Sequence, residues 1–267
     1  MAQLISWNVN GIRAAEKKGL FDYLQDHKPD ILSLQETKAN PDQLSDVFSE
    51  QPGYHAYFAS AARKGYSGVA IYSRIKPLSV DVFGHERFDS EGRVLAAEYD
   101  DFVLINAYFP NSQAEGKRLD YKLDFCDTML SYMNTIVDQG KHVIVCGDFN
   151  IAHKPIDLAR PAQNEGNPGY LPEERAWFDT LVEAGYLDTF REFDSSAEQY
   201  SWWSYRMQAR AKNIGWRLDY HVIDPGFRSS VSGAGIQQHI LGSDHCPVTL
   251  ELSDTSLDTD VRGEAGT

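Results

Sequence analysis

Cysteine is scarce in this chain of 267 residues, which has only Cys126, Cys146 and Cys246. The three lie far apart and form no C-x-x-C pair, which argues against a disulfide framework and against a zinc knuckle. The chain also lacks a run of about 18 apolar residues, so we expect no transmembrane helix. Its opening residues, MAQLISWN, lack the basic and apolar regions of a signal peptide. These absences lead us to expect a protein of a reducing compartment, the cytoplasm.

Positive charge is also in short supply, with 25 Lys and Arg against 39 Asp and Glu. A chain this acidic repels polyanions as a whole, so contact with nucleic acid has to come from a local basic patch. One segment fits that description, residues 201–217, SWWSYRMQARAKNIGWR, which contains no acid. It holds Arg206, Arg210, Lys212 and Arg217, interleaved with Trp202, Trp203, Tyr205 and Trp216. Residues 253–267, in contrast, are acidic and almost without apolar side chains, which predicts a disordered tail.

Residues 1–252 are expected to form a single catalytic domain, since α/β domains often reach this size without splitting. Short apolar runs at 4–7, 30–34, 68–73, 94–99, 102–108, 142–146, 218–223 and 247–252 predict buried strands. Apolar side chains at helical spacing predict a helix over 119–137. A second helix is predicted over 172–184 and a weaker one over 13–24, interrupted by Gly19.

Polar clusters follow several predicted strands and precede others. Asn8, Glu36 and Asp148 come at strand ends, whereas Asp219 and the pair Asp244-His245 stand at or before strand starts. If the clusters meet, the two kinds of strand run in opposite directions, which predicts mixed sheets with one polar rim. Two such sheets packed face to face and flanked by helices form a four-layered α/β sandwich.

The polar residues also suggest a chemistry. Asn8 with Asn10, and Asp148 with Asn150, are spaced two apart, so in extended backbone each pair presents both side chains to one place. A single pair is commonly turn chemistry, but two pairs that each close a hydrophobic strand favour a site. Carboxylate and amide oxygens are hard ligands that select Mg²⁺, or Mn²⁺, over zinc. The residues therefore predict a metal-assisted phosphoesterase in which Asp148 deprotonates a water.

Seven blocks carry a resemblance to a known family. They are SWNVNGIRA, LQETK, YSGVAIYSR, NAYFPN, CGDFNIAH, GWRLDY and GSDHCPV, in this order between residue 6 and residue 248. The chain resembles the exonuclease III-type AP endonucleases of the endonuclease/exonuclease/phosphatase superfamily, whose DNase I-like fold is a four-layered sandwich. The resemblance implies a Mg²⁺-dependent DNA repair enzyme that hydrolyses the backbone 5′ to abasic sites. It further implies 3′-5′ exonuclease and 3′-end-cleaning activities.

The resemblance also implies roles for individual residues. The metal site would comprise Asn8, Glu36, Asp148, Asn150, Asp244 and His245, with Glu36 as the main ligand; Asn10 stands where some relatives have Asp. The catalytic residues would be Tyr108, Asn111, Asp148, Asn150, Asp219 and His245, where Asp219 holds His245 at its second nitrogen. The pocket for an extruded abasic sugar would be walled by Trp202, Trp216 and Leu218. Arg118, Arg206, Arg210 and Lys212 would contact the DNA.

Two alternatives remain open from the sequence. A superfamily phosphatase or phosphodiesterase acting on inositol phosphates or sphingolipids would use much the same metal site. A catalytically dead DNA-binding module is the second alternative, and the intact set Glu36, Asp148, Asn150, Asp219 and His245 speaks against it. The expected partner is double-stranded DNA with abasic sites or blocked 3′ ends, bound by a monomer with no membrane association.

Overall fold

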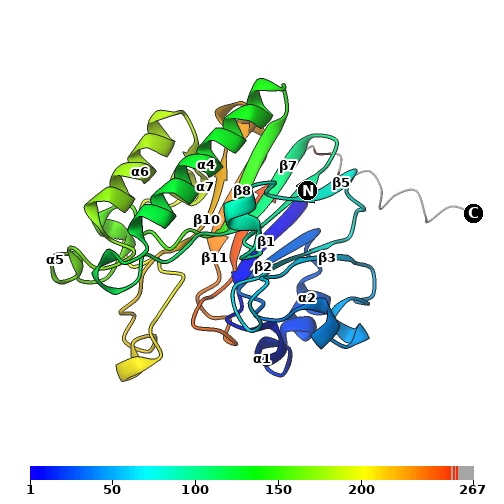
Figure 1. Cartoon of the computed structure of the whole chain (residues 1–267), viewed down its shortest axis with the longest axis horizontal. Helices are drawn as coiled ribbons and strands as arrows, with labels where there is room; N and C mark the ends of the chain where they lie inside the picture. The colour runs from blue at the N-terminus through cyan, green and yellow to red at the C-terminus, as the bar shows by residue number, and fades with distance from the viewer. Residues whose placement is uncertain (254, 256, 258–267) are drawn as a thin grey trace, which may run out of the picture.

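Two six-stranded sheets pack face to face in the computed structural model, which describes residues 1–253, 255 and 257 (Figure 1). The first sheet has the order β11 (Val231–Ile236), β12 (Val248–Leu252), β1 (Ala2–Asn8), β2 (Ile31–Gln35), β4 (Val69–Ser73) and β3 (His55–Ala59). The second has the order β5 (Ser79–Val82), β6 (Val94–Glu98), β7 (Phe102–Tyr108), β8 (His142–Asp148), β10 (Asp219–Ile223) and β9 (Leu187–Asp188). In each sheet one central pair is parallel, β1 with β2 and β7 with β8, and the other pairs are antiparallel.

Helices cover the outer faces of both sheets. On one side lie α1 (Ile12–Glu16) and α2 (Leu20–His27), and on the other α4 (Leu119–Asp138) and α6 (Pro172–Glu183) (Figure 1). The shorter helices are α3 (Glu86–Asp89), α5 (Pro161–Asn164) and α7 (Thr189–Phe193). Turns of 3₁₀ helix are η1 (Pro41–Gln43), η2 (Asp46–Phe48), η3 (Ala114–Gly116), η4 (Pro155–Asp157), η5 (Arg206–Gln208) and η6 (Pro225–Ser230). The predicted α/β sandwich of two mixed sheets flanked by helices is confirmed.

The inner face of the second sheet changes character along its strands. At the rim, Tyr108, Asp148 and Asp219 are neighbours across β7, β8 and β10. Two residues further in, the neighbours are Asn106, Cys146 and His221, and two residues beyond those they are Leu104, Ile144 and Ile223. The space between the sheets is therefore apolar in its depth and polar toward one rim, where the predicted site residues lie.

All eight predicted strands are present, as β1, β2, β4, β6, β7, β8, β10 and β12. The four strands that sequence reasoning missed, β3, β5, β9 and β11, are the edge strands of the two sheets. Edge strands face solvent along one side and need no continuous apolar run, as the largely exposed β5 illustrates. Their sequences therefore give little signal.

The predicted helices are also present, with one difference in α4. Gly19 separates α1 from α2 with a φ of 91°, a conformation that glycine adopts readily. The helical spacing in the sequence predicts an apolar stripe of Leu119, Leu123, Cys126, Leu130, Met133 and Val137. The buried face of α4 shares Cys126 and Met133 with this stripe and otherwise consists of Lys122, Phe125, Met129 and Ile136. Leu123 and Leu130 pack at the edge of the core instead. The shift brings a lysine into the buried face.

The structure describes little of the predicted tail. Leu257 is buried and packs in the core between the sheets, so contacts with the domain reach past residue 252. The rest of the predicted disorder falls largely outside the described residues. Within the described part of the chain, no helix combines the length and the apolar character needed to cross a bilayer.

Gly147, between Cys146 and Asp148 on β8, has a φ of 138°, and a Cβ there would overlap the carbonyl oxygen of Ala107 on β7. Gly147→Ala should therefore lower the free energy of unfolding by about 3 kcal/mol or more, measured by urea denaturation. Gly140→Ala is the matched control, since Gly140 has a φ of 81° but open space around it. It should cost only about 1 kcal/mol. Equal losses in the two variants would contradict the close approach of β7 to β8.

Candidate active site

Six polar side chains converge on one rim because strands of both sheets end or begin there. Asn8 ends β1, Glu36 directly follows β2, and Tyr108 and Asp148 end β7 and β8. Asp219 begins β10, antiparallel to β8, and His245 lies just before β12, antiparallel to β1. The predicted opposition of strand directions is what brings these residues, from both halves of the chain, to the same place.

The amide of Asn8 links the two carboxylates of the site. Its Nδ2 donates to Oε1 of Glu36 and to Oδ2 of Asp148, both at 2.9 Å. Its oxygen accepts a hydrogen bond from the backbone N–H of Asn10 at 3.0 Å. In these contacts Asn8 acts as a donor that lies between the two carboxylates, and its role as a metal ligand stays a prediction. Asn10 in turn donates to Asp244 at 2.9 Å and accepts from Lys38.

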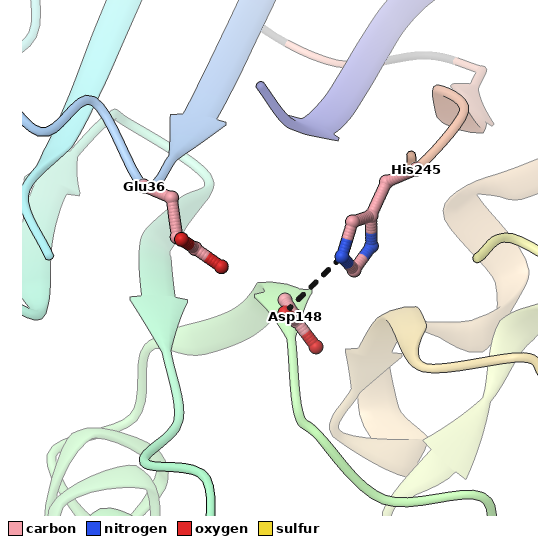
Figure 2. A group of neighbouring side chains, drawn as sticks. All are labelled: Glu36, Asp148 and His245. Atoms are coloured by element: carbon pink, nitrogen blue, oxygen red, sulfur yellow. Dashed lines mark ion pairs between the residues drawn. The ribbon is translucent and has the colours of Figure 1, made fainter. Parts of the chain in front are cut away.

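His245 sits between two carboxylates. Its Nδ1 lies 2.8 Å from Oδ2 of Asp219, and its Nε2 lies 3.8 Å from Oδ2 of Asp148 (Figure 2). Burial disfavours the imidazolium, yet Asp219 and Asp148 outweigh it and raise the pKa of His245 to about 10. The side chain is therefore a cation at neutral pH, held in one orientation.

Asp148 is a buried carboxylate of the rim, with 2% of its side chain exposed. Its pKa is raised to about 7, chiefly by burial and also by the nearby charges of Asp219 and Glu36, although His245 opposes the rise. Its Oδ1 accepts from the backbone N–H of Asn150 at 2.8 Å, and its Oδ2 from the side chain of Asn150 at 3.2 Å. A carboxylate with a pKa near neutrality can both take and hold a proton at physiological pH.

The donor atoms fit a hard divalent cation. Among the residues that the structure describes, the group able to hold a metal is Glu36, Asp148 and His245, whose ligand atoms lie within 4.8 Å of one another. In Figure 2 the three side chains point toward a common space from three separate elements. Burial raises the pKa of Glu36, but Lys38, which pairs with it at 2.6 Å, and the hydrogen bond from Asn8 together hold that pKa below its ordinary value. Carboxylate oxygens are the ligands expected for a metal of this class.

Tyr108 and Asn111 lie near Asp148 and Asn150 in the same site. Burial, and then the charges of Glu36 and Asp148, raise the pKa of Tyr108 well above its ordinary value, so its hydroxyl stays protonated. Nδ2 of Asn111 donates to Oδ1 of Asn150 at 3.0 Å. The guanidinium of Arg93 lies over the ring of Tyr108, 4.8 Å from its centroid. Each side chain is thus held by a neighbour before any substrate arrives.

The rim opens into a cavity of about 320 Å³ with a polar and an apolar side. Glu36, Tyr108, Asn111, Asp148, Asn150, Asp244 and His245 line the polar side. Trp202, Trp216 and Leu218 line the other, together with Pro168 and Gly169. The two indoles meet edge to face with ring centroids 6.3 Å apart, and Nε1 of Trp202 donates to Asp244 at 3.1 Å. The predicted aromatic wall therefore adjoins the predicted metal and catalytic residues.

The side chains predicted to contact DNA through positive charge differ in exposure and in the partners that they already have. Arg206 and Lys212 are exposed. Arg210 donates to the carbonyls of Ser243, Gln238 and Ile240 and lies over the ring of Trp203, so its guanidinium holds two loops together. Arg118 bonds to Tyr66 at 2.6 Å and to Glu91 at 2.7 Å. Arg217, which lies in the same segment but was not predicted to contact DNA, is buried and pairs with Asp157 and Asp188.

Sequence reasoning missed three contributors to the site. Lys38 stands two residues after Glu36, in the block LQETK, so spacing could have suggested it. Pro168 and Gly169 come from a loop with no recognisable motif. Asn10, Glu36 and Asn150, in contrast, were predicted, but their positive φ values of 47°, 52° and 51° were not. Such strained backbone is common where a fold fixes functional side chains.

Comparison with known proteins places this geometry in a family. The sequence pattern of the "Endonuclease/Exonuclease/phosphatase family" matches residues 5–245. The chain belongs to this family. It is 44% identical over 254 residues to an exodeoxyribonuclease of Bacillus subtilis (strain 168), which covers 94% of this chain and 99% of that protein. It is 43% identical to the DNA repair nuclease APEX1 of Danio rerio, over 94% of this chain and 82% of that one.

Solved structures agree with the sequence relatives. The AP endonuclease LMAP from Leishmania major superposes with a TM-score of 0.84 at 29% identity, covering 95% of this chain and 88% of that chain. A 3′ phosphatase, NExo, from Neisseria, solved with a product DNA hairpin, gives 0.85 at 26% identity, covering 95% and 100%. The predicted enzyme class, a hydrolase of the nuclease type in a family of metal-dependent enzymes, is confirmed by these relatives.

The ion pair between Asp219 and His245 yields a test on the metal-free protein in EDTA. Asp219→Asn removes the nearer negative charge, so the pKa of His245 should fall from about 10 toward its ordinary value of about 6.5. NMR of the imidazole carbons over a pH titration measures this shift. Because a raised pKa stabilises the folded state below pH 6.5 and ceases to do so as the pH passes 10, stability should also depend less on pH in this range.

Asp179→Asn is the control for that titration, because Asp179 pairs with a different imidazole, that of His153, at 2.7 Å. It should leave the titration of His245 unchanged. An unchanged pKa of His245 in Asp219→Asn would refute the pairing.

Proposed function

We propose that this family member hydrolyses the DNA backbone 5′ to abasic sites, with Mg²⁺ as its metal, and that it also trims blocked 3′ ends. The observation that carries the proposal is the two-sided cavity, in which a carboxylate and imidazole cluster faces a wall of two indoles and Leu218. The first side suits a phosphate and the second suits a deoxyribose that lacks its base. The names of the relatives from Bacillus subtilis and Danio rerio point the same way.

Glu36 and Asp148 would hold the metal, with His245 and Asp244 beside it. When bound, Mg²⁺ would neutralise charge on the phosphate and lower the barrier to its hydrolysis. The hard oxygen ligands favour Mg²⁺ or Mn²⁺ over softer metals.

Hydrolysis needs a base, donors to the phosphate and an acid. Asp148 would take a proton from a water whose oxygen attacks the phosphorus. The imidazolium of His245 and the amides of Asn150 and Asn111 would donate to the phosphate oxygens as negative charge builds on them. The bond from phosphorus to the 3′ oxygen then breaks, and Tyr108, which keeps its proton, would supply that oxygen with one. The products are a 3′-hydroxyl and a 5′-phosphate on the abasic sugar.

The apolar wall would select the substrate. Backbone bridges join Trp202 to Trp216 and to His245, so the two indoles are held close to the imidazole. The part of the cavity between them is therefore narrow. A flipped sugar without a base fits against flat apolar faces, whereas a base attached to it would have to displace an indole. The exposed Arg206 and Lys212 would hold the duplex by its phosphates without reading sequence. We propose double-stranded DNA as the partner of a monomer.

The proposal is tested by comparing substrates with one enzyme preparation. A duplex with a single abasic site, the same duplex without the lesion, and a soluble inositol phosphate are incubated with Mg²⁺ or with EDTA. With Mg²⁺, we expect the abasic duplex to be incised within minutes while the other two substrates are not cleaved. In EDTA we expect no incision. Phosphate release from the inositol phosphate with an intact abasic duplex would assign the protein to another branch of the superfamily.

Asp148→Asn keeps the shape of the side chain but removes the base. Turnover at saturating DNA should fall by about 10² to 10⁴-fold while DNA affinity stays near wild type. Single-turnover rates and fluorescence anisotropy on the abasic duplex measure the two quantities. Loss of affinity with an unchanged rate at saturation would make Asp148 a binding residue.

Trp216→Ala opens the cavity wall without removing charge, so the ratio of incision on abasic and undamaged duplex should fall while the salt dependence of binding stays the same. Arg206→Ala and Lys212→Ala should weaken binding to the abasic and the undamaged duplex alike and leave the incision ratio unchanged. Each should also make the dependence of binding on salt concentration shallower. A melting curve accompanies each variant, because truncating a packed Trp costs roughly 3 to 5 kcal/mol. An unchanged ratio in a folded Trp216→Ala protein would contradict the pocket.

A further inference from the structure

A fully buried ion pair lies behind the polar side of the cavity, next to the segments that carry Asn111 and Asn150. Lys122 of α4 and Glu174 of α6 are both 0% exposed, and Nζ of Lys122 lies 2.8 Å from Oε1 of Glu174. Around them is the aromatic core that includes Phe109, Phe149 and Trp177. Two opposite charges in such surroundings lose their hydration, and apolar side chains of similar size commonly serve packing as well or better. Stability alone therefore does not account for the pair.

The remaining contacts of the pair reach the active-site loops. Nζ of Lys122 also donates to the backbone carbonyl of Asn150 at 2.6 Å. Oε1 of Glu174 accepts the hydroxyl of Ser112, and Oε2 accepts the backbone N–H of Leu171 at 2.9 Å. Every carboxylate oxygen thus has a partner, and the two side chains connect three loops that are far apart in the sequence.

Each of those loops supplies part of the cavity lining. Ser112 follows Asn111, and Leu171 closes the loop that carries Pro168 and Gly169, so both segments reach the cavity next to the contact with Glu174. Asn150 is held directly. The carbonyl that accepts from Lys122 belongs to Asn150, whose φ of 51° is uncommon for a non-glycine residue, although asparagine adopts it more readily than most.

We propose that the ion pair of Lys122 and Glu174 is a positioning device for Asn111 and Asn150, and thereby for the attack on the phosphate. This inference rests on the proposed function. Lys122 fixes the backbone of Asn150. The side-chain Nδ2 of Asn150 can then donate to the carbonyl of Phe109 at 3.0 Å and to Oδ2 of Asp148 at 3.2 Å. Glu174 fixes Ser112, and with it Asn111, whose amide meets Asn150 at 3.0 Å. Without the pair, Asn150 can relax from its strained conformation and withdraw its amide from Asp148.

The test uses Lys122→Met/Glu174→Gln in the full chain, which removes both charges together and leaves no unpaired buried ion. On an abasic duplex with Mg²⁺, kcat should fall by about 10 to 100-fold, the loss expected when reacting groups are displaced by a fraction of an ångström to 1 Å. KM for the DNA should stay within about threefold of wild type, because the pocket wall and the exposed cations are untouched.

Met133→Ala is the matched control, since Met133 lies on the same buried face of α4 but touches none of the three loops through a hydrogen bond. It should lower the melting temperature and leave kcat unchanged at a temperature where it is folded. If the double variant is folded at that temperature and turns over at the wild-type rate, the pair is only structural and the inference is overturned.

Ser112→Ala keeps the proposal testable if the double variant does not fold. It retains the ion pair and removes only the hydroxyl that ties the Asn111 loop to Glu174. We expect a fall in kcat of about 3 to 10-fold with KM unchanged. No change in kcat would contradict the positioning of Asn111 by this contact.

The wild-type protein separates this inference from the proposed function. If wild type fails to incise the abasic duplex, the proposed substrate is wrong, and the same variants are compared on a duplex with a recessed 3′ end or a 3′-phosphate. A loss of kcat in the double variant on the substrate that wild type does hydrolyse supports positioning. Equal rates on that substrate overturn it, whatever the substrate is.

Discussion

The amide of Asn8 joins the two sheets at the rim where the candidate site residues meet. It donates to Glu36, which follows a strand of its own sheet, and to Asp148, which ends a strand of the other. One row deeper, Nδ2 of Asn106 crosses between the sheets to the carbonyls of Leu34 at 3.1 Å and Ala70 at 2.8 Å, and Gln35 donates to its oxygen. Apolar packing stabilises the contact between the sheets in proportion to the buried area, but it does not fix their relative position because it is non-directional. Hydrogen bonds have preferred distances and angles and therefore do constrain that position. The distance between the two carboxylates therefore depends on polar contacts placed just beneath them.

The sequence predicts the centre of this molecule better than its edges. The buried strands, the opposition of their directions and the convergence of Asn8, Glu36, Asp148, Asp219 and His245 follow from apolar runs that end or begin in polar residues. Lys122 and Glu174 could not be found in this way. A lysine on an amphipathic helix is ordinarily assigned to the solvent face, and its partner lies 52 positions away on another helix. Only the packing of α4 against α6 reveals that both charges are buried.

The acid-free segment 201–217 serves both the fold and the cavity. Arg210 ties together backbone carbonyls and Arg217 is buried among aspartates, which leaves Arg206 and Lys212 exposed. Trp203 is buried in the fold, while Trp202 and Trp216 line the cavity. The sequence identifies the segment as a unit, because charge and aromatic content are visible in it. It does not divide these roles, since they depend on which loop each side chain meets.

We propose that carboxylates from the two sheets share one metal site on which hydrolysis depends. Calorimetric titration of Mg²⁺ into DNA-free wild type and Glu36→Ala tests it most directly, with incision rates on the abasic duplex measured over the same range of Mg²⁺. The account predicts that Glu36→Ala binds Mg²⁺ at least tenfold more weakly, is nearly inactive at low Mg²⁺ and recovers part of its rate at high Mg²⁺. Wild-type affinity for Mg²⁺ together with wild-type turnover at low Mg²⁺ would contradict it.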